Sequence, residues 1–252
     1  MDVVGMRRLA SFPLSATLPC PLRLLHGAAF VLFTLLTLLT IGGCAPARDP
    51  HAALLRQLDD GLARVETVQG LLDITQGPVT LNQEFWLQRP SFLRTETESG
   101  PGAFQGVIVA LNHREGWVYS PALNLVTVVD RSNYTPVLAG EAGAGSSLER
   151  LPADVRRAVE AGYPIHKAGN ETLAGRRTDH WEISVPAGDA AFPAGPLHVW
   201  LDTKYAYPLA LRDASGREIR FRSVDFNASI DPLVFEFVPP PGALVQRVES
   251  GD

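Results

Sequence analysis

The sequence predicts an α+β domain built mainly from antiparallel strands, with two helices lying on one face of a curled sheet. Three observations carry this prediction. Many short segments alternate apolar and polar residues with a period of two, and turn residues bound each of them. Two other stretches have helical periodicity instead. An antiparallel sheet with this many strands must curl or close, and two amphipathic helices need an apolar face to cover.

Composition narrows the class of protein. The chain has 252 residues with 22 Lys+Arg and 27 Asp+Glu, a formal net charge of −5. Nucleic-acid binding requires a clustered basic face, and no such cluster is present, so we expect no nucleic-acid partner. The two cysteines are Cys20 and Cys44. Cys20 lies in a predicted leader, so the exported domain would have no disulfide and must depend on its apolar core.

The first 43 residues have the features of a bacterial lipoprotein signal peptide. Arg7, Arg8 and Arg23 precede an apolar run over 27–41, and Leu39-Thr-Ile-Gly-Gly-Cys44 resembles a lipobox. We expect cleavage before Cys44, diacylglycerol on its thiol, palmitate as a lipid modification, and a lipidated tether over 44–50. An uncleaved transmembrane anchor is the alternative interpretation. Both interpretations place the domain, residues 51–252, outside the cytoplasm.

The first helix is predicted over His51–Gln69. Its apolar residues recur on one stripe, and charged residues lie outside that stripe. The stripe consists of Leu54, Leu55, Leu58, Leu62, Val65 and Val68. Gly61 is expected to weaken this helix by about 1 kcal/mol relative to alanine. Gly70 is a plausible stop signal.

From Leu71 the period changes to two. Strands are predicted at 79–88, 92–98, 104–111, 116–120 and 123–129. The pattern lapses over 132–147, where glycines are frequent. A second helix then follows over Leu148–Ala161, with a narrow apolar stripe that includes Leu151, Val155 and Val159. Six further strands are predicted at 165–173, 177–185, 197–202, 208–213, 218–227 and 233–238. A β-bulge near Arg222–Ser223 would explain why the buried face changes within the fifth of these.

Catalytic and metal-binding signatures are missing from the sequence. His113, His166, His180 and His198 have no metal-ligand spacing such as H-E-x-x-H. The serines after Gly145 fit neither a nucleophile elbow nor a phosphate loop. We therefore expect a protein that is not an enzyme and that carries no metal and no cofactor apart from its lipid anchor.

Several segments, in order along the chain, resemble one family. Trp86-Leu-Gln-Arg-Pro90 with Phe92-Leu-Arg94, and Gly116-Trp-Val-Tyr-Ser-Pro121, resemble strand signatures of the LolA-type and LppX-type lipoprotein carrier superfamily. Asn170–Arg176, Leu201–Leu209 and Ile230–Gly242 resemble its later strand and turn segments. The family's shuttle is soluble, whereas this chain has its own lipobox. Lipid-anchored relatives, such as mycobacterial lipid-binding lipoproteins, are therefore the better comparison.

The resemblance implies an open half-barrel whose helices form a lid over an apolar cavity. Arg89 matches the arginine that hydrogen-bonds the lid in the carriers, so it is predicted to be a lid latch. Phe92 or Leu93 matches the adjacent cavity-edge position. Residues of strands and helix are predicted to line the cavity: Phe85, Leu87, Phe92, Leu93, Val107, Val109, Leu111, Trp117, Tyr119, Leu151, Val155 and Val159. The aromatic residues among them could equally be ordinary core, because alternation shows burial and not whether the interior is filled.

Two functions remain open at this point. The first is a monomeric, membrane-tethered protein that binds or transfers lipids or acylated lipoproteins in the bacterial cell envelope. It would be anchored on the outer side of the cytoplasmic membrane or in the outer membrane. The second is an envelope-stress sensor of the same fold that binds an anti-sigma factor.

Overall fold

In this computed structural model, the described residues are 49–130, 145–189 and 192–248. The predicted signal peptide, the predicted lipidation site Cys44 and most of the predicted tether lie outside them. The chain divides after Ala47, and Arg48–Asp252 form one compact unit. Within the described ranges, no helix has both the length and the apolar character needed to cross a membrane.

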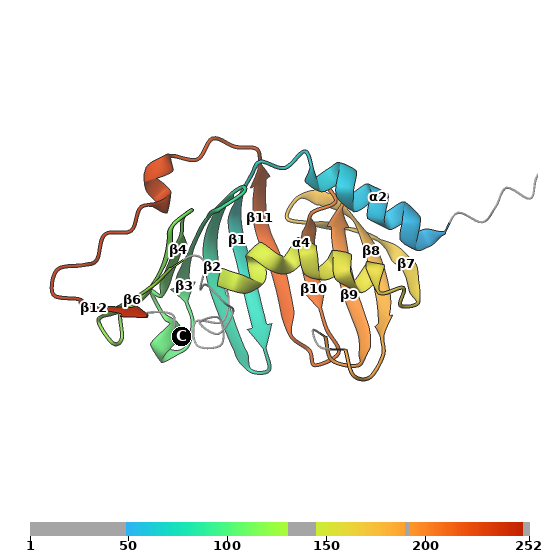
Figure 1. The fold of residues 1–252 in the computed structure, drawn as a ribbon. Coiled ribbons are helices and arrows are strands. Elements are labelled where there is room, and N and C mark those ends of the chain that lie inside the picture. Colours follow the sequence, from blue (N-terminus) through green and yellow to red (C-terminus); the bar gives the residue numbers. More distant parts are fainter. Residues whose placement is uncertain (1–48, 131–144, 190–191, 249–252) are drawn as a thin grey trace, which may run out of the picture. The chain divides into compact units, whose positions relative to one another are not determined.

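One sheet contains twelve strands in the described part of the chain, in the order β12-β6-β5-β4-β3-β2-β1-β11-β10-β9-β8-β7 (Figure 1). Every pair is antiparallel except β12 and β6, which are parallel. The strands are β1 (Thr67–Gln76), β2 (Val79–Gln88), β3 (Phe92–Ser99), β4 (Ile108–Leu111), β5 (Glu115–Ser120), β6 (Leu125–Asp130), β7 (Ile165–Leu173), β8 (Arg176–Val185), β9 (Gly195–Asp202), β10 (Pro208–Arg212), β11 (Glu218–Phe226) and β12 (Leu244–Val248).

The strand order explains where the second helix must lie. The strands β1 to β6 form one meander and β7 to β11 form another, and the two meet where β1 pairs with β11. The chain therefore has to return from β6, near one edge, to β7 at the other edge. Helix α4 (Gly145–Glu160) lies in this connection and crosses one face of the sheet (Figure 1). We call the face that α4 covers the inner face.

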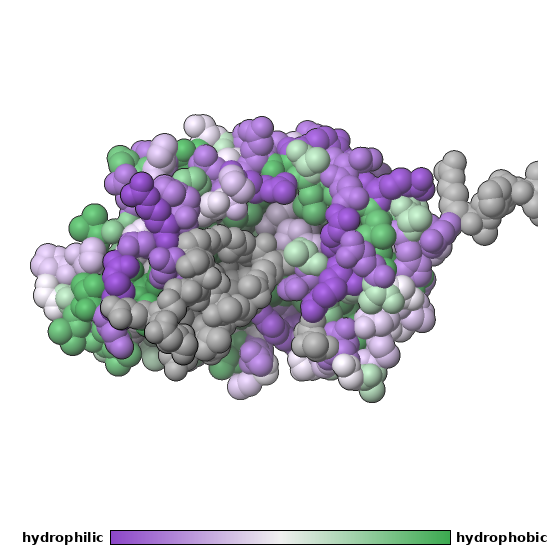
Figure 2. Space-filling model, viewed as in Figure 1, coloured by the Kyte–Doolittle hydropathy of each residue, from purple (hydrophilic) through white to green (hydrophobic). Residues whose placement is uncertain are grey.

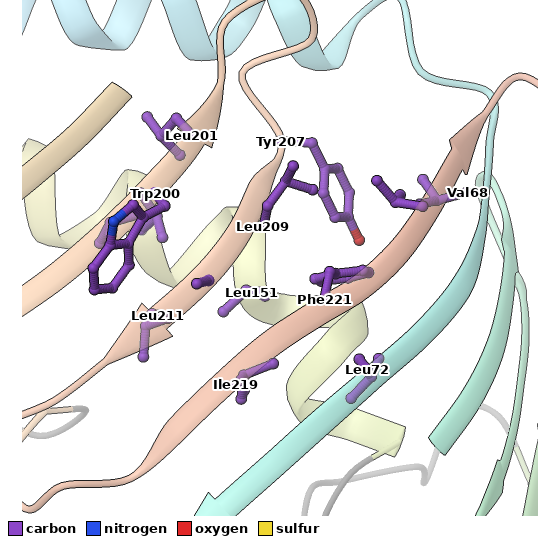
Figure 3. Close-up of a cluster of buried hydrophobic side chains, with 14 of the residues drawn as sticks. Val68, Leu72, Leu151, Trp200, Leu201, Tyr207, Leu209, Leu211, Ile219 and Phe221 are labelled. Atoms are coloured by element: carbon purple, nitrogen blue, oxygen red, sulfur yellow. The ribbon is translucent and has the colours of Figure 1, made fainter. Parts of the chain in front are cut away.

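The inner face and α4 share one hydrophobic core. Leu151, Val155 and Val159 of α4 are buried and belong to the same cluster as Leu72, Phe221 and Leu209 of the strands (Figure 3). Burying side chains of this size stabilises the fold by about 1.5–3 kcal/mol each. The predicted antiparallel, unclosed sheet with helices on one face is therefore confirmed. A lid that moves over an enclosed cavity stays a prediction, since these lid residues are packed against the sheet.

The first helix is shorter than predicted. Helix α2 covers Pro50–Leu62, and Asp49 caps it by accepting a hydrogen bond from the His51 backbone N–H. Residues 67–69, predicted to be helical, belong instead to β1. The prediction extended the helix too far because Val65 and Val68 fit its apolar stripe. Both side chains are buried, but they belong to the core that the sheet forms and not to a helix. Strand pairing of this segment with β2 and β11 overrides its helical periodicity.

The predicted β-bulge is confirmed. Leu71 pairs with Ser223 and Leu72 pairs with Phe221, so Arg222 is the extra residue on β11. Gly70, predicted to end the helix, instead permits close approach of β11. A Cβ at this position would lie 2.1 Å from the backbone oxygen of Ser223.

Two other strand predictions need correction. The chain before β4 forms a 3₁₀ turn at Gly102–Phe104, so this strand begins at Ile108 and not at 104. The predicted strand over 233–238 is absent, because Pro232–Phe235 is a second 3₁₀ turn capped by Asp231. The last strand, β12, was not predicted. It is short, solvent-exposed and paired in parallel, so it lacks the apolar–polar alternation that identifies a half-buried strand.

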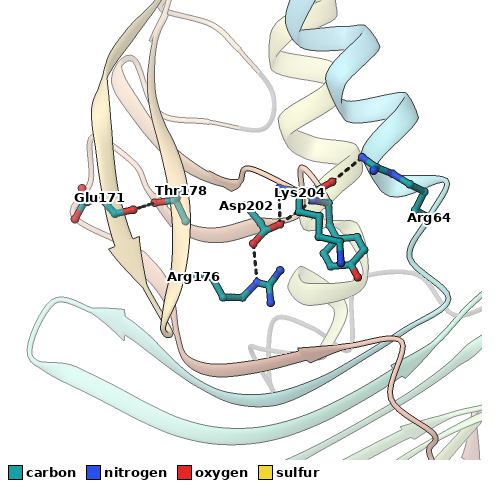
Figure 4. A network of polar contacts seen from close by, with 7 residues as sticks. Arg64, Glu171, Arg176, Thr178, Asp202 and Lys204 are labelled. Carbon is teal, nitrogen blue, oxygen red and sulfur yellow. Dashed lines mark hydrogen bonds and ion pairs between the residues drawn. The ribbon is translucent and has the colours of Figure 1, made fainter.

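A buried aspartate fixes the turn between β9 and β10 (Figure 4). Asp202 is 1% exposed; it accepts a hydrogen bond from Arg176 Nε at 2.6 Å and others from the backbone N–H groups of Lys204 and Tyr205. Lys204 in turn accepts a hydrogen bond from Arg64 at its backbone oxygen, at 2.6 Å. This network holds the chain just after α2 against the sheet.

Candidate functional site

The two helices run antiparallel to one another. His51, at the start of α2, donates from Nε2 to the backbone oxygen of Tyr163, just after α4, at 2.7 Å. Farther along, Asp59 of α2 forms an ion pair with Arg156 of α4. Leu62 at the end of α2 and Pro152 of α4 then lie on opposite sides of a hollow. The helix pair is thus closed at one end and leaves a pocket at the other.

This hollow, which we call the α2–α4 pocket, has a volume of about 330 Å³. Buried residues of the core, Val65, Leu87 and Tyr207, form its floor. Arg89, Pro90, Pro152, Ala153 and Arg156 surround its opening, together with Leu62. A more open hollow of about 500 Å³ adjoins it and shares Val65, Arg89 and Pro90. An apolar floor with a few polar groups at the opening is typical of small-molecule sites, which measure about 300–1,000 Å³.

Arg89 connects the end of β2 to the end of α2. Its Nη1 donates to the backbone oxygen of Leu62 at 2.6 Å and to that of Val65 at 3.3 Å. Leu62 is the last residue of α2, and the carbonyl groups of a last helical turn have no partner within the helix. A guanidinium also complements the negative end of the helix dipole. Arg89 therefore contacts the helix as the latch prediction requires, whereas its effect on opening stays a prediction.

The two arginines at the opening differ in their charge environment. Arg156 forms ion pairs with Asp59 and Glu160, and its hydrogen bonds to these carboxylates raise its pKa. Arg89 is bonded to carbonyl oxygens, and no carboxylate in the described part of the chain forms an ion pair with it. The pocket opening therefore has an uncompensated positive charge at Arg89, on the side formed by the sheet.

Tyr207, which lines the pocket, carries a buried polar atom. Its side chain is 2% exposed, and its hydroxyl has no hydrogen-bond partner within the described part of the chain. Figure 3 shows the ring beside Phe221, Val68 and Leu209. Burial raises the pKa of the Tyr207 phenol well above its ordinary value, and the charge of Arg89 opposes this rise only in part. The hydroxyl therefore stays protonated at neutral pH and can act as a donor.

Most predicted cavity residues lie on the inner face, in the core beneath α4. Phe85, Leu87, Leu93, Val109 and Leu111 belong to the same cluster as the three α4 residues. Val107 is also buried, just before β4 begins, but it is not part of that cluster. Of these strand residues, Leu87 also lines the α2–α4 pocket. The other members are packed against side chains of the core.

Three predicted cavity residues lie on the opposite face, so their prediction was wrong. Trp117 pairs with Ala110 and Tyr119 with Ile108, and these positions alternate with the inner-face residues Val109 and Leu111. Phe92 is next to the inner-face Leu93. Aromatic residues of the segment after β11 cover this face: Phe235 lies 5.4 Å from Phe92 and Phe237 lies 6.0 Å from Tyr119, between ring centroids. Alternation identified two faces for these strands but not which one α4 covers.

The sequence did not point to several pocket residues. Nothing in it indicates that the Tyr207 hydroxyl is buried or that Pro152 faces a hollow. Arg156 did offer a signal, because Glu160 follows it at the spacing of a helical ion pair. The contact between Arg156 and Asp59 depends on the antiparallel helix pair, which no local pattern predicts.

No protein-family model and no curated protein matches this sequence. Solved structures do resemble it. An uncharacterised conserved protein from Thermus thermophilus has a TM-score of 0.51 and 12% identity, with 79% of this chain and 100% of that chain covered. MucB has a TM-score of 0.51 and 15% identity, and the match covers 75% of this chain but only 62% of MucB.

The mycobacterial lipoprotein LppX and a LolA superfamily protein from Nitrosomonas europaea are further matches, at TM-scores of 0.46 and 0.32. LppX is 16% identical, with 72% of this chain and 97% of LppX covered. Structures of the LolA and LppX group are thus among those that resemble this chain. The two matches with TM-scores of 0.51 carry the comparison, and identities this low show the fold alone.

Proposed function

We propose that this chain is a membrane-tethered protein of the bacterial cell envelope that binds or transfers acyl chains of lipids or lipoproteins. Lipid on Cys44 would hold it at the membrane, on the outer side of the cytoplasmic membrane or in the outer membrane. The observation that carries the binding role is the α2–α4 pocket, which combines a buried apolar floor with two arginines at its opening. The lipobox-like segment before Cys44 supports the anchor.

The pocket suits one acyl chain. Its volume of about 330 Å³ is near the lower end of the range for ligand sites, which favours a single chain over a lipid with two. Each methylene group that moves from water into such a site contributes about 0.8 kcal/mol. A chain in contact with Leu62, Val65 and Leu87 would therefore bind mainly through the hydrophobic effect. Separation of α2 from α4 would enlarge the site and permit uptake or release.

The binding role can be tested by blocking the pocket opening. Ala153 is exposed on α4 and lines the pocket, so Ala153→Trp should fill the opening without disturbing the core. Ala161, exposed just beyond the far end of α4, provides the matched control Ala161→Trp. We expect residues 48–252 to bind a fluorescent fatty acid, Ala153→Trp to lose at least tenfold in affinity, and Ala161→Trp to retain it. Equal binding by the two variants would contradict a site between the helices.

The anchor is tested separately in cells. Full-length protein should incorporate labelled palmitate and fractionate with membranes, whereas Cys44→Ala should incorporate none. Palmitate on the Cys44→Ala protein would contradict the assignment of this residue.

A second function is favoured by a different observation. MucB, which shares the fold at a TM-score of 0.51, has also been solved in complex with MucA. In this chain, the edge strand β12 exposes Leu244 and Val245, at 69% and 58%, and Leu123 of the β5–β6 turn is also exposed. Figure 2 shows apolar residues on the surface at this end of the sheet. Binding of an anti-sigma factor at this edge is the alternative, and loss of partner capture on Leu244→Asp would support it.

A further inference from the structure

A buried hydroxyl without a partner requires an explanation. Burying a hydroxyl without a hydrogen bond costs about 1–3 kcal/mol, and most buried polar groups in proteins have partners. The Tyr207 hydroxyl has none among the residues that the structure describes, although Tyr207 lines the α2–α4 pocket. The aromatic rings around it offer no strong acceptor: Phe221 and Phe226 lie 6.1 and 5.5 Å away between ring centroids. A ligand in the pocket could supply the missing acceptor.

The neighbouring charge indicates what kind of acceptor fits. Arg89 lines the same pocket, and its positive charge opposes the rise in the pKa of the Tyr207 phenol. No carboxylate in the described ranges is paired with that charge. A hydroxyl donor and a guanidinium that has only neutral carbonyl partners among the described residues favour an oxygen acceptor that carries negative charge. The remaining lining, from Leu62, Val65 and Leu87, is apolar and suits an alkyl chain.

We propose that Tyr207 and Arg89 recognise the head of an anionic acyl ligand, with Tyr207 donating a hydrogen bond to a carboxyl or acyl carbonyl oxygen. The ligand class is a single-chain fatty acid or an anionic lipid that presents one acyl chain. This inference rests on the proposed function, because it assigns the orientation of a chain bound in the α2–α4 pocket. The head lies toward Arg89 and Tyr207, and the chain extends along the apolar lining.

The test compares two amphiphiles that have the same chain. Dodecanoate carries a negative oxygen acceptor, whereas dodecyltrimethylammonium carries a positive head without an acceptor. Calorimetry on residues 48–252 should show that dodecanoate binds more tightly. Tyr207→Phe should weaken dodecanoate binding about tenfold, the effect of losing one hydrogen bond to a charged group. It should leave dodecyltrimethylammonium binding unchanged.

Thermal unfolding without ligand provides a second measurement. Tyr207→Phe removes an unsatisfied hydroxyl, so the melting temperature should stay the same or rise. The matched control is Tyr163→Phe, at the far end of α4, where the hydroxyl donates to Asp189 at 2.8 Å. That variant should be less stable and bind dodecanoate normally.

The outcomes separate the inference from the proposed function. If neither amphiphile binds, the proposed function fails and the inference fails with it. If both bind and Tyr207→Phe binds dodecanoate like the wild type, acyl-chain binding survives and the inference is wrong. A Tyr207→Phe protein that is less stable without ligand would also overturn the inference, because the hydroxyl would already have a partner. A methyl dodecanoate arm tests the charge, since an uncharged ester that binds as tightly as dodecanoate would overturn recognition of an anionic head.

Discussion

Arg89 shows how far a single residue could be interpreted from the sequence. Its position after a strand and before Pro90 resembled a family signature, and the structure places its guanidinium on the last carbonyl of α2. Tyr207 could not be found in this way, because an unsatisfied hydroxyl is a property of the packed core. Phe92, Trp117 and Tyr119 were assigned to the wrong face for a related reason. Local alternation does not state which face a distant helix covers.

Replacing Arg89 should loosen the end of α2. Arg89→Gln removes hydrogen bonds to the Leu62 and Val65 carbonyl groups, so we expect a loss of about 1 kcal/mol in the free energy of unfolding. Urea denaturation measures this loss, and amide exchange should accelerate near residues 62–66. Arg56→Gln, on the exposed side of α2, is the matched control. Equal stability of the two variants would show that Arg89 is not a latch.

His180 should make the protein sensitive to acid. Its ring stacks on Trp200 at 4.3 Å, and its Nε2 lies 3.1 Å from His198 Nδ1. Burial, and then the charge of His198, lower the pKa of His180 from its ordinary value of 6.5. As the pH falls, His180 therefore binds a proton in the unfolded chain at a higher pH than in the folded protein. Acid consequently favours the unfolded chain and lowers the stability of the fold.

The measurement is the melting temperature between about pH 7 and pH 5, where histidine titrates. The wild type should lose stability across this range, and His180→Gln should lose less. His113→Gln, at an exposed turn, should behave like the wild type. A His180→Gln curve parallel to that of the wild type would contradict the assigned role.

At the scale of elements, most strands could be predicted, but their partners could not. Alternation located ten strands within a few residues, because each buries one face. The helix boundary at Leu62 was missed since sheet pairing overrode a helical stripe. The parallel pairing of β12 with β6 joins segments far apart in the sequence, and only the folded chain specifies it.

Gly61 lies where α2 touches the turn before β10. A Cβ at this position would lie 2.4 Å from the Tyr205 backbone oxygen, which cannot move without disturbing the Asp202 network. Gly61→Ala should therefore destabilise the protein by about 1–3 kcal/mol, although alanine favours an isolated helix by about 1 kcal/mol. Chemical denaturation decides between these effects, with Arg56→Ala as the exposed control. A gain in stability would show that α2 is not held against this turn.

The ion pair between α2 and α4 should affect ligand exchange more than stability. Both Asp59 and Arg156 are about half exposed, and exposed pairs contribute little to folding. Asp59→Asn removes the ion pair that joins the two helices and leaves the Arg156–Glu160 pair within α4, so the helices are less firmly joined at the pocket. Stopped-flow measurements should show faster release of a fluorescent fatty acid and an almost unchanged melting temperature. Unchanged release would indicate that the helices do not separate during exchange.

For the whole molecule, the topology explains why a pocket can form at this place. Two meanders meet at the centre of the sheet, so the connection between its edges must cross the inner face and carries α4 with it. Helix α2 then packs antiparallel to α4, and the pair diverges above the end of β2. The sequence predicted the sheet and the helices, but the antiparallel helix pair and its pocket arise only from their packing.

The central claim is that the α2–α4 pocket holds an acyl chain, and native mass spectrometry of residues 48–252 purified from cells tests it most directly. We predict a discrete added mass that extracts into organic solvent as an acyl-containing lipid. The Ala153→Trp protein should lack this mass and Ala161→Trp should retain it. A wild-type protein that shows only the mass of the polypeptide and binds no added fatty acid would contradict the claim.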